Sequence, residues 1–330
     1  MKNILILFGG GSSEHEISKI SCDYLVSQID TSKFNILKVE ITKGFIWKLD
    51  EKIVELNFDK VLVSDGKALS KIDYVIPCIH GYPGETGDIQ SYLDLVSVPY
   101  LGVGAEASKI CFNKVLTKLW LQKLNFPTAD FLFFNISNKD DEQIQERSLE
   151  FLEKKSKVFI KASNQGSSIG CYSALTKEEL RDSIKDAFNF SDFVLVESFI
   201  KGRELEVAVF EFDNKIHATK PGEIHCPSDF YDFDQKYKDN SQTQIDILAK
   251  NLSPEITKQI TTMAKDVFKA LSLKGLSRID FFLTDHGEIL INEINTFPGM
   301  TPISLFPQMM ENSGVPFSDF LTQRIISDIL

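Results

Sequence analysis

The sequence has no apolar run that approaches the length of a membrane span, so no membrane partner is expected. The first run, Asn3 to Phe8, ends at Gly9 and is too short for the apolar core of a signal peptide. Cysteine is also scarce, and no pair has the close spacing of a metal knuckle or a redox motif. We therefore expect free thiols in a reducing cytoplasm at Cys22, Cys78, Cys111, Cys171 and Cys226.

Basic residues are fewer than acidic residues: 36 Lys and Arg against 47 Asp and Glu give a formal net charge of −11. A nucleic-acid-binding surface needs a basic stripe, so we expect no nucleic acid partner. A local basic pocket for phosphates is still compatible, because net charge does not say where lysines converge. With 43% hydrophobic and 25% charged residues over 330 positions, the chain is an ordinary folded protein of two or three domains.

The N-terminal part of the sequence alternates apolar runs with glycine-rich turns. Asn3 to Phe8 is continuously apolar, which is typical of a strand buried on both faces of a parallel sheet, and Gly9 to Gly11 end it. A second apolar run, Tyr74 to Ile79, leads into the glycine-rich turn His80 to Gly87. The repetition of strand, turn and helix predicts a doubly wound α/β domain over residues 1–102.

Two further regions are predicted, over residues 103–192 and 193–330. A helical pattern that begins near Lys109 opens the second region, and its apolar positions are Val115, Leu116, Leu119 and Trp120. In the third region, Lys220 to Gln244 is a long polar and aromatic stretch without a clear period. A long irregular segment in a compact domain is more often functional than filler, so it predicts a lid.

Acidic and amide side chains are paired on two predicted strands, Arg278-Ile279-Asp280 and Glu293-Ile294-Asn295. Residues two apart in a strand point to the same face, so neighbouring strands would bring three oxygen donors and one guanidinium together. Such hard oxygen ligands suit Mg²⁺. Ile289 and Ile291 are predicted to share the face of Glu293, which would then change from apolar to polar as the floor of a site does. The alternative is a solvent-facing strand with salt bridges.

A loop of small polar residues, Ser163 to Gly170, follows Lys161 at the end of a predicted strand. Its glycines and hydroxyls would let backbone N–H groups approach an anion closely, although no Walker A motif occurs. Taken alone, such a loop would be interpreted as an ordinary surface turn. Lys114 and the acidic strands supply the other parts of a nucleotide site.

The turn Gly9 to Gly11 leaves a dinucleotide-binding fold, as in an NAD-dependent dehydrogenase, as an alternative. The fingerprint for that fold needs a third glycine where this chain has Glu14. A carboxylate at the start of a helix repels a pyrophosphate but attracts an ammonium group. The turn therefore favours an amine substrate over NAD.

Six motifs follow one another along the chain: Gly9 to Ser18, His80 to Glu85, Lys161 to Gly170, Phe230 to Tyr237, Arg278 to Asp280, and Glu293 to Thr301. In this order they resemble the motifs of the D-alanine–D-alanine ligases, a family of the ATP-grasp superfamily. The resemblance implies a three-domain ATP-grasp fold of the α/β class, with ATP between the second and third domains. Departures from the family pattern are Thr86, Asn113 and Ala162.

The resemblance also implies an activity. ATP and two molecules of D-alanine would give D-alanyl-D-alanine, ADP and phosphate through a D-alanyl phosphate, for peptidoglycan precursor synthesis. The reaction would use two Mg²⁺ ions, or Mn²⁺ in their place. The enzyme would be a homodimer in the cytoplasm. The rivals are an ATP-grasp ligase that forms a D-alanyl ester or joins different amino acids, and an inactive nucleotide-binding regulator. The latter would have no reason to retain Lys161, Arg278, Asp280, Glu293 and Asn295.

Site roles are implied residue by residue. For ATP, the resemblance assigns the phosphates to Lys114 and Lys161, adenine to Glu197 with the backbone of Phe199 and Ile200, and ribose to Glu204. It assigns the metal ions to Asp280, Glu293 and Asn295, and the stabilisation of developing charge to Arg278 with the backbone N–H of Gly299.

The implied substrate contacts begin with Glu14, which would pair with the ammonium group of the first D-alanine. His80 would lie near the carboxylate of that D-alanine. The second carboxylate would be bound by Lys236, Ser304 and the backbone of Leu305. Ser167 and Tyr237 would bond towards Glu14 and close the lid. A protonated histidine at this position would repel the ammonium group of a second D-alanine. Tyrosine stays neutral, so Tyr237 predicts D-alanine rather than D-lactate as the second substrate.

Overall fold

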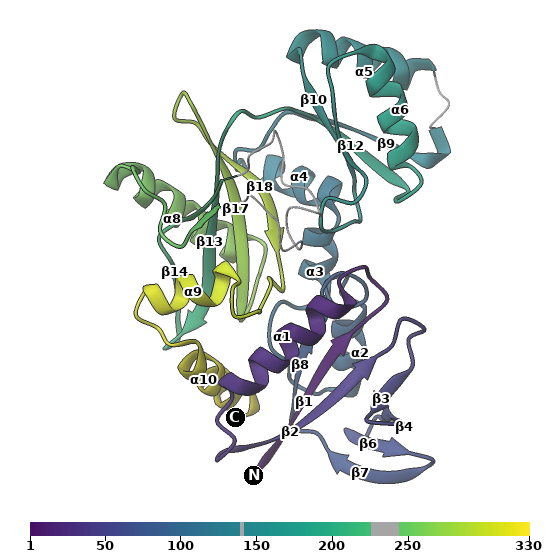
Figure 1. Ribbon diagram of the computed structural model, residues 1–330, viewed down its shortest axis with the longest axis vertical. Coiled ribbons are helices and arrows are strands. Elements are labelled where there is room, and N and C mark those ends of the chain that lie inside the picture. The colour runs from purple at the N-terminus through teal and green to yellow at the C-terminus, as the bar shows by residue number, and fades with distance from the viewer. Residues whose placement is uncertain (139–141, 226–243) are drawn as a thin grey trace.

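The computed structural model describes residues 1–138, 142–225 and 244–330 (Figure 1). In this part of the chain the strands form four sheets, of five, four, six and three strands. The N-terminal sheet lies at one end of the molecule, the four-stranded sheet at the other, and the six-stranded sheet beside them (Figure 1). The N- and C-termini lie near each other at the N-terminal end.

The N-terminal sheet is built around the first apolar run. Strand β1 (Lys2–Gly9) pairs in parallel with β2 (Phe34–Ile41) on one side and with β8 (Tyr74–Cys78) on the other. Ile4 and Ile6 pack with helix α1 (His15–Gln28), whereas Leu5 and Leu7 pack with α2 (Asp88–Val96) on the opposite face. Burial on both faces explains the continuous apolar run and confirms the predicted doubly wound arrangement.

Short antiparallel strands extend this region. The sheet order is β4-β3-β2-β1-β8, in which β3 (Trp47–Leu49) and β4 (Lys52–Ile53) add an antiparallel edge. A separate small sheet contains β5 (Glu55–Leu56), β6 (Val61–Ser64) and β7 (Lys67–Lys71).

The four-stranded sheet is antiparallel, in the order β11-β10-β12-β9. Its strands are β9 (Phe131–Asn135), β10 (Val158–Ala162), β11 (Cys171–Ala174) and β12 (Phe193–Ser198). Val158 and Ile160 pack in a core with residues of helices α5 (Glu142–Lys155) and α6 (Lys177–Ala187). The alternate residues Phe159 and Lys161 point the other way and line a cavity, as strand periodicity requires.

The six-stranded sheet has the order β16-β15-β13-β17-β18, with β14 paired to β13. Helix α8 (Pro254–Ala270) packs on its apolar face. The strands are β13 (Gly202–Phe212), β14 (Lys215–Ala218), β15 (Gly222–His225), β16 (Gln244–Asp246), β17 (Leu276–Thr284) and β18 (Ile289–Asn295). Strands β15 and β16 pair directly, so the two ends of the predicted lid lie side by side, while residues 226–243 between them fall outside the described part.

The last two helices tie the C-terminal sheet to the N-terminal sheet. Helices α9 (Leu305–Asn312) and α10 (Phe317–Ile329) share one apolar core with α1, β1 and β8. The buried hydroxyl of Tyr74 on β8 donates a hydrogen bond to Asp328 on α10, with 2.7 Å between the oxygens. Within the described ranges, none of the helices combines the length and apolar character that a membrane crossing requires.

The helix predicted from Lys109 is divided into α3 (Ala105–Phe112) and α4 (Lys114–Lys123), and the predicted apolar face of α4 is wrong. Val115 and Leu121 are buried, but Leu116, Leu119 and Trp120 are 41%, 39% and 43% exposed. Thr117 and Lys118 occupy the buried face instead, because that face meets a polar network described below.

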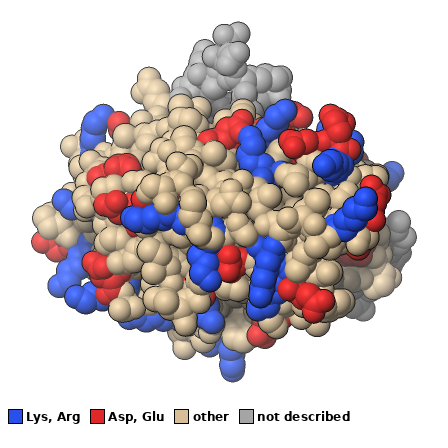
Figure 2. All heavy atoms as spheres, turned by 90° about the horizontal axis from the view of Figure 1, so that it is seen from below, with Lys and Arg blue, Asp and Glu red and all other residues tan. Residues whose placement is uncertain are grey.

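Charge is distributed without a strong bias over the face of the molecule seen from its N-terminal end. Basic and acidic side chains are intermixed there, among larger areas of uncharged residues (Figure 2). This face therefore shows no large patch of a single charge sign.

Candidate active site between three sheets

A cavity of about 890 Å³ lies where the N-terminal, four-stranded and six-stranded sheets approach one another. Every predicted site residue in the described ranges lines it: Glu14, His80, Lys114, Lys161, Ser167, Glu197, Phe199, Ile200, Glu204, Arg278, Asp280, Glu293, Asn295, Gly299, Ser304 and Leu305. The predicted residues Lys236 and Tyr237 lie outside the described residues.

The acidic floor of the cavity comes from the pairing of β17 with β18. Asp280 is opposite Glu293 and Arg278 is opposite Asn295, so the two predicted motifs lie side by side. Nε and Nη2 of Arg278 each donate to a carboxylate oxygen of Asp280 at 2.8 Å, and the amide of Asn295 donates to Asp280 at 2.9 Å. The paired strands thus place two carboxylates, one amide oxygen and one guanidinium on the surface of the cavity.

A β-bulge decides which face of β18 enters the cavity. The register of β18 shifts by one residue between Ile291, opposite Phe281, and Glu293, opposite Asp280. Ile289 and Ile291 therefore face the apolar core beneath the sheet, while Glu293 faces the cavity. The prediction that these isoleucines share the face of Glu293 is wrong, because strict alternation fails across the extra residue, Asn292.

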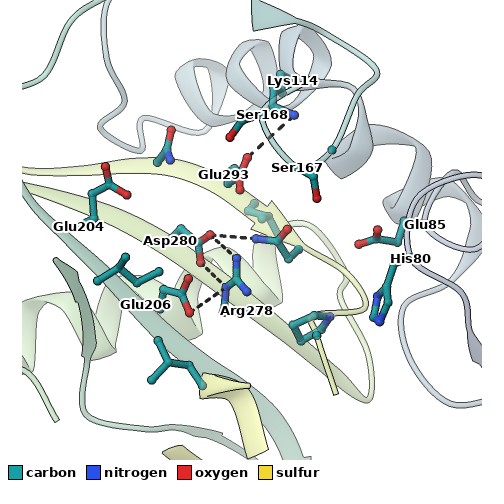
Figure 3. A pocket seen from close by; sticks show the side chains of 18 of the residues that line it. His80, Glu85, Lys114, Ser167, Ser168, Glu204, Glu206, Arg278, Asp280 and Glu293 are labelled. Carbon is teal, nitrogen blue, oxygen red and sulfur yellow. Dashed lines mark hydrogen bonds and ion pairs between the residues drawn. The ribbon is translucent and has the colours of Figure 1, made fainter. Parts of the chain in front are cut away.

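Glu206 is a cavity residue that the sequence reasoning missed. It lies on β13 opposite Asp280, and its carboxylate is 3.2 Å from Nε of Arg278 (Figure 3). Burial works against the charge of Arg278, but Asp280 and Glu206 outweigh it and hold the pKa of the guanidinium well above its usual range. Its spacing of two from Glu204 was the available signal, since both residues share one face of the strand.

Lys161 and Glu197 form a buried ion pair on the opposite wall, across β10 and β12. Glu197 also contacts Lys118, whose Nζ lies 2.9 Å from Oε2. Burial raises the pKa of a carboxyl group, but Lys118 and Lys161 outweigh burial here and lower the pKa of Glu197 to about 2. Lys118 was not predicted, because a lysine on a helix is normally assigned to the solvent face.

The loop after Lys161 is held against the start of α4. Lys114 donates to the carbonyl of Gln165 at 2.6 Å, and its Nζ lies 3.9 Å from Glu293 across the cavity. Asn113 caps α4 by accepting from the N–H groups of Val115 and Leu116. An amide oxygen serves as an N-cap as an aspartate would, so the departure at this position keeps the helix start intact.

Glu14 lies at the other end of the cavity, immediately before α1. The hydroxyl of Ser167 donates to Glu14 at 2.7 Å, which joins the loop of the four-stranded sheet to the N-terminal region. His80 hydrogen-bonds through Nε2 with the Ser21 hydroxyl at 2.9 Å, and burial lowers the pKa of its imidazole. An ammonium group bound here would meet a carboxylate beside an uncharged imidazole.

A second carboxyl group, Glu85, stands beside Glu14. It accepts a hydrogen bond from the N–H of Gly81 at 2.7 Å and faces the cavity together with His80 (Figure 3). Burial, reinforced by the negative charge of Glu14, raises the pKa of Glu85 to about 8. Thr86 bonds to Asp88 rather than to either acid, so the departure at Thr86 leaves their direct contacts in place.

The segment after β18 turns back over the cavity floor. The N–H of Thr301 donates to the hydroxyl of Ser304 at 3.0 Å, and Ser304 is the residue that precedes α9. Gly299 packs against this turn, since a Cβ at Gly299 would lie 3.0 Å from the Ser304 oxygen. Gly299, Thr301 and Ser304 of this turn all line the cavity.

On the adenine side of the predicted site, Phe199 has its backbone N–H engaged. It donates to the carbonyl of Lys157 at 3.2 Å, and the ammonium group of Lys157 lies 3.9 Å from the centre of the Phe199 ring. The backbone N–H of Phe199 therefore already has a hydrogen-bond acceptor.

The cavity has lysines from helix α4 and the four-stranded sheet on one side and the acids of the six-stranded sheet on the other, and with the structural neighbours given below this is the architecture of an ATP-grasp enzyme. Residues 3–103 match the family model described as D-ala D-ala ligase N-terminus, and residues 120–327 match D-ala D-ala ligase C-terminus. The chain belongs to the D-alanine–D-alanine ligase family.

Individual relatives agree over the whole chain. The D-alanine–D-alanine ligase of Shewanella sediminis is 48% identical over 99% of both chains. Among solved structures, D-alanyl-alanine synthetase A from Vibrio cholerae superposes with a TM-score of 0.92 at 44% identity, over 99% of this chain and 98% of that one. The VanG D-Ala:D-Ser ligase from Enterococcus faecalis superposes with a TM-score of 0.88 at 29% identity, over 100% and 99%.

Proposed function

We propose that this protein joins two molecules of D-alanine into D-alanyl-D-alanine at the expense of ATP, for peptidoglycan precursor synthesis. One observation carries the proposal: the cavity combines the lysines Lys114 and Lys161, the acidic floor around Asp280, and Glu14 at the opposite end. The first two groups suit a nucleotide, and Glu14 suits the ammonium group of an amino acid. Family membership supplies the identity of that amino acid.

The reaction we propose has two steps. A carboxylate oxygen of the first D-alanine attacks the γ-phosphorus of ATP, so that D-alanyl phosphate forms and ADP leaves. The amine of the second D-alanine, after losing a proton, attacks the carbonyl carbon, and phosphate leaves. Phosphoryl transfer requires mainly positioning and charge stabilisation, which Lys114, Lys161 and Arg278 would provide at the phosphates.

The acidic floor fits the divalent cations that such a reaction uses. Asp280, Glu293 and Asn295 offer carboxylate and amide oxygens on one surface, the ligands that Mg²⁺ and Mn²⁺ prefer. We assign two ions to these residues. When bound, such ions neutralise charge on the phosphates during transfer. Arg278 would add a fixed positive charge beside them.

For the first D-alanine we propose Glu14 as the partner of the ammonium group, oriented by its hydrogen bond from Ser167. His80 would lie beside the carboxylate. The backbone N–H of Gly299 would act with Arg278 on the oxyanion that forms at the carbonyl carbon. Ser304 and the backbone of Leu305 would bind the carboxylate of the second D-alanine.

Lys236 and Tyr237 complete our assignment of the second subsite and the lid, on the basis of the motif alone. We also assign adenine to Glu197 with the backbone of Phe199 and Ile200, and ribose to Glu204. Residues 1–102, 103–192 and 193–330 are proposed as the three domains, of which the first supplies the first subsite and the last supplies the metal site and lid.

We further propose that the enzyme acts as a homodimer in the cytoplasm. Leu116, Leu119 and Trp120 support an interface on α4, because they present apolar side chains to solvent at helical spacing. A second copy of this chain is the occupant we propose for this surface.

A phosphate-release assay with ATP, Mg²⁺ and a panel of D- and L-amino acids tests the activity. D-Alanine is expected to support the fastest release, and chromatography with D-alanine and D-lactate both supplied is expected to show dipeptide as the main product. If the main product contained D-serine, or were a depsipeptide at neutral pH, the proposal of two D-alanines as substrates would be wrong. Release that is independent of any amino acid would remove the ligase assignment.

A further inference from the structure

Lys118 is the most deeply buried charged side chain near the cavity, and the proposed mechanism does not use it. It is 2% exposed, lies on α4, and stands behind the cavity wall, which Thr117 and Glu197 line. Its Nζ lies 2.9 Å from Oε2 of Glu197, donates to the hydroxyl of Thr128 at 2.7 Å, and lies 5.8 Å from the centre of the Phe131 ring. A buried lysine costs free energy unless its charge is paired, so this arrangement requires a reason.

The contacts of Lys118 belong to a closed ring that joins two sheets. Glu197 pairs with Lys161, which donates to Asn292 at 3.1 Å. Thr128 donates to the carbonyl of the neighbouring residue Ile291 at 2.9 Å. One side of the ring therefore lies at the β-bulge that turns Glu293 towards the cavity.

Under the proposed function, the ammonium group of Lys161 has two anionic partners, Glu197 and the phosphates of the nucleotide. In this structure its ammonium group pairs with Glu197, which is only 3% exposed. Under the proposed function, the same ammonium group must also neutralise phosphate. A buried carboxylate that loses its only counter-charge is strongly destabilised, so Glu197 would hold Lys161 back if no second cation were present.

Counting the partners of Glu197 shows what Lys118 changes. Burial lowers the pKa of Lys118, and the carboxylate of Glu197 opposes that shift, so that Glu197 has two lysines as partners where Lys161 alone would leave it one. With Lys118 against it, Glu197 still has a counter-charge when the ammonium group of Lys161 turns to an anion. The thiol of Cys171, paired opposite Lys161 on β11, and the carboxylate of Glu293 are the other titratable groups near this charge.

We propose that Lys118 is a positioning residue that keeps Glu197 charge-compensated, so that Lys161 can turn to the phosphates of the nucleotide. Lys118 acts through Glu197 and does not touch the substrate. The proposal rests on the nucleotide role assigned to Lys161 and Glu197 above. It gives α4 a function in phosphate binding beyond that of Lys114 at its first turn.

The test compares the affinities of ATP and adenosine by calorimetry, without D-alanine so that no turnover occurs. Lys118→Met is expected to weaken ATP binding by about ten- to a hundred-fold, the loss typical of a charge-assisted contact, and adenosine binding by far less. Equal losses for ATP and adenosine would mean a merely structural role and would overturn the proposal, as would unchanged ATP affinity. Lys123→Met, an exposed lysine on the same helix, is the matched control.

A second pair of variants keeps the test decisive if Lys118→Met does not fold. Because Lys118 acts only through Glu197, adding Lys118→Met to Glu197→Gln is expected to leave the ratio of ATP to adenosine affinity unchanged. A fall in that ratio would show that Lys118 acts on the phosphates independently and would overturn the proposal. Lys161→Met tests the proposed function separately: if it retained the parent ratio, the phosphate role of Lys161 itself would fail.

Discussion

At the scale of single residues, the properties of the cavity depend on how buried charges are paired. Arg278 and Glu197 each keep their charge in spite of burial because two oppositely charged groups lie against each of them. Glu85 has the opposite surroundings, since burial and a neighbouring carboxylate act in the same direction. The contacts of each of these three residues therefore explain the direction of its pKa shift.

The acidic floor leads to the first prediction. Asp280→Ala or Glu293→Ala is expected to abolish phosphate release in the presence of D-alanine and Mg²⁺, because each removes a charged oxygen ligand. Asn295→Ala is expected to have a milder effect, since a neutral amide oxygen contributes less. A thermal denaturation scan controls for folding. Turnover by folded Glu293→Ala near the parent rate would contradict the metal assignment.

The second prediction concerns Glu14. Glu14→Gln is expected to raise KM for the first D-alanine by roughly ten- to a hundred-fold, because a charge-assisted hydrogen bond contributes about 1.5–3 kcal/mol. KM for ATP is expected to change little. Steady-state kinetics with each substrate varied in turn gives both values. If KM for D-alanine is unaltered, Glu14 serves only as an acid at the N-terminal end of α1.

The third prediction follows from the pKa of Glu85, which lies near 8 in the folded protein and near 4.5 when exposed to solvent. Between these values the folded state binds a proton that the unfolded state lacks, so the contribution of this carboxyl group to stability falls as pH rises. Glu85→Gln is neutral at every pH and removes this dependence. The melting temperature of the parent is therefore expected to fall more steeply than that of Glu85→Gln between about pH 5 and pH 8.

Scanning fluorimetry without nucleotide measures this difference. Glu16→Gln, a change at an exposed acid of α1, is the control and is expected to follow the parent. Parallel curves for the parent and Glu85→Gln would show that Glu85 ionises normally in the folded protein.

At the scale of elements, the site depends on where strands and helices depart from regular patterns. The bulge in β18 lets Asn292 and Glu293 face the cavity in succession, so that one contacts Lys161 and the other approaches Lys114. Helix α4 buries polar groups because the face that meets the sheets carries the ring of Lys118. Both departures occur at the cavity, where function rather than burial of apolar area determines the residue.

A fourth prediction concerns the contact of α10 with β8. Tyr74→Phe removes the buried hydrogen bond to Asp328. Asp328 also accepts a hydrogen bond from Arg324, which in turn pairs with Glu211. The variant is expected to lose about 1–2 kcal/mol of unfolding free energy, less than a fully orphaned charge would cost, because Asp328 keeps Arg324. Urea denaturation measures the shift. Tyr100→Phe, whose bond to Asp94 is exposed, is expected to change stability far less.

At the scale of the whole molecule, the cavity exists only because three sheets converge. Ser167 reaches Glu14 from the four-stranded sheet, and Lys114 approaches Glu293 from α4. The shared core of α9 and α10 with the N-terminal sheet fixes the third side. Substrate ends that are bound by different regions can be brought together only if these regions keep their relative positions.

The last prediction addresses assembly. If α4 forms a dimer interface, Leu119→Glu places a charge among apolar side chains and is expected to convert the dimer to a monomer of about 37.3 kDa. Light scattering after size-exclusion chromatography measures the mass. Leu175→Glu, at another exposed leucine, is expected to leave the dimer intact. A dimer that persists in Leu119→Glu would place the interface elsewhere.

The sequence by itself determined the parallel N-terminal sheet, the family, and the neighbouring strands of Arg278 and Glu293, because burial on both faces and side-chain alternation are local properties. Tertiary structure alone decided the burial of Lys118, the pairing of Glu206 with Arg278 and the exposure of Leu119. It also decided that Glu293 points to the cavity, because the extra residue Asn292 in β18 breaks the side-chain alternation. Each of these depends on which distant segment lies opposite, and periodicity along one segment carries no information about that partner.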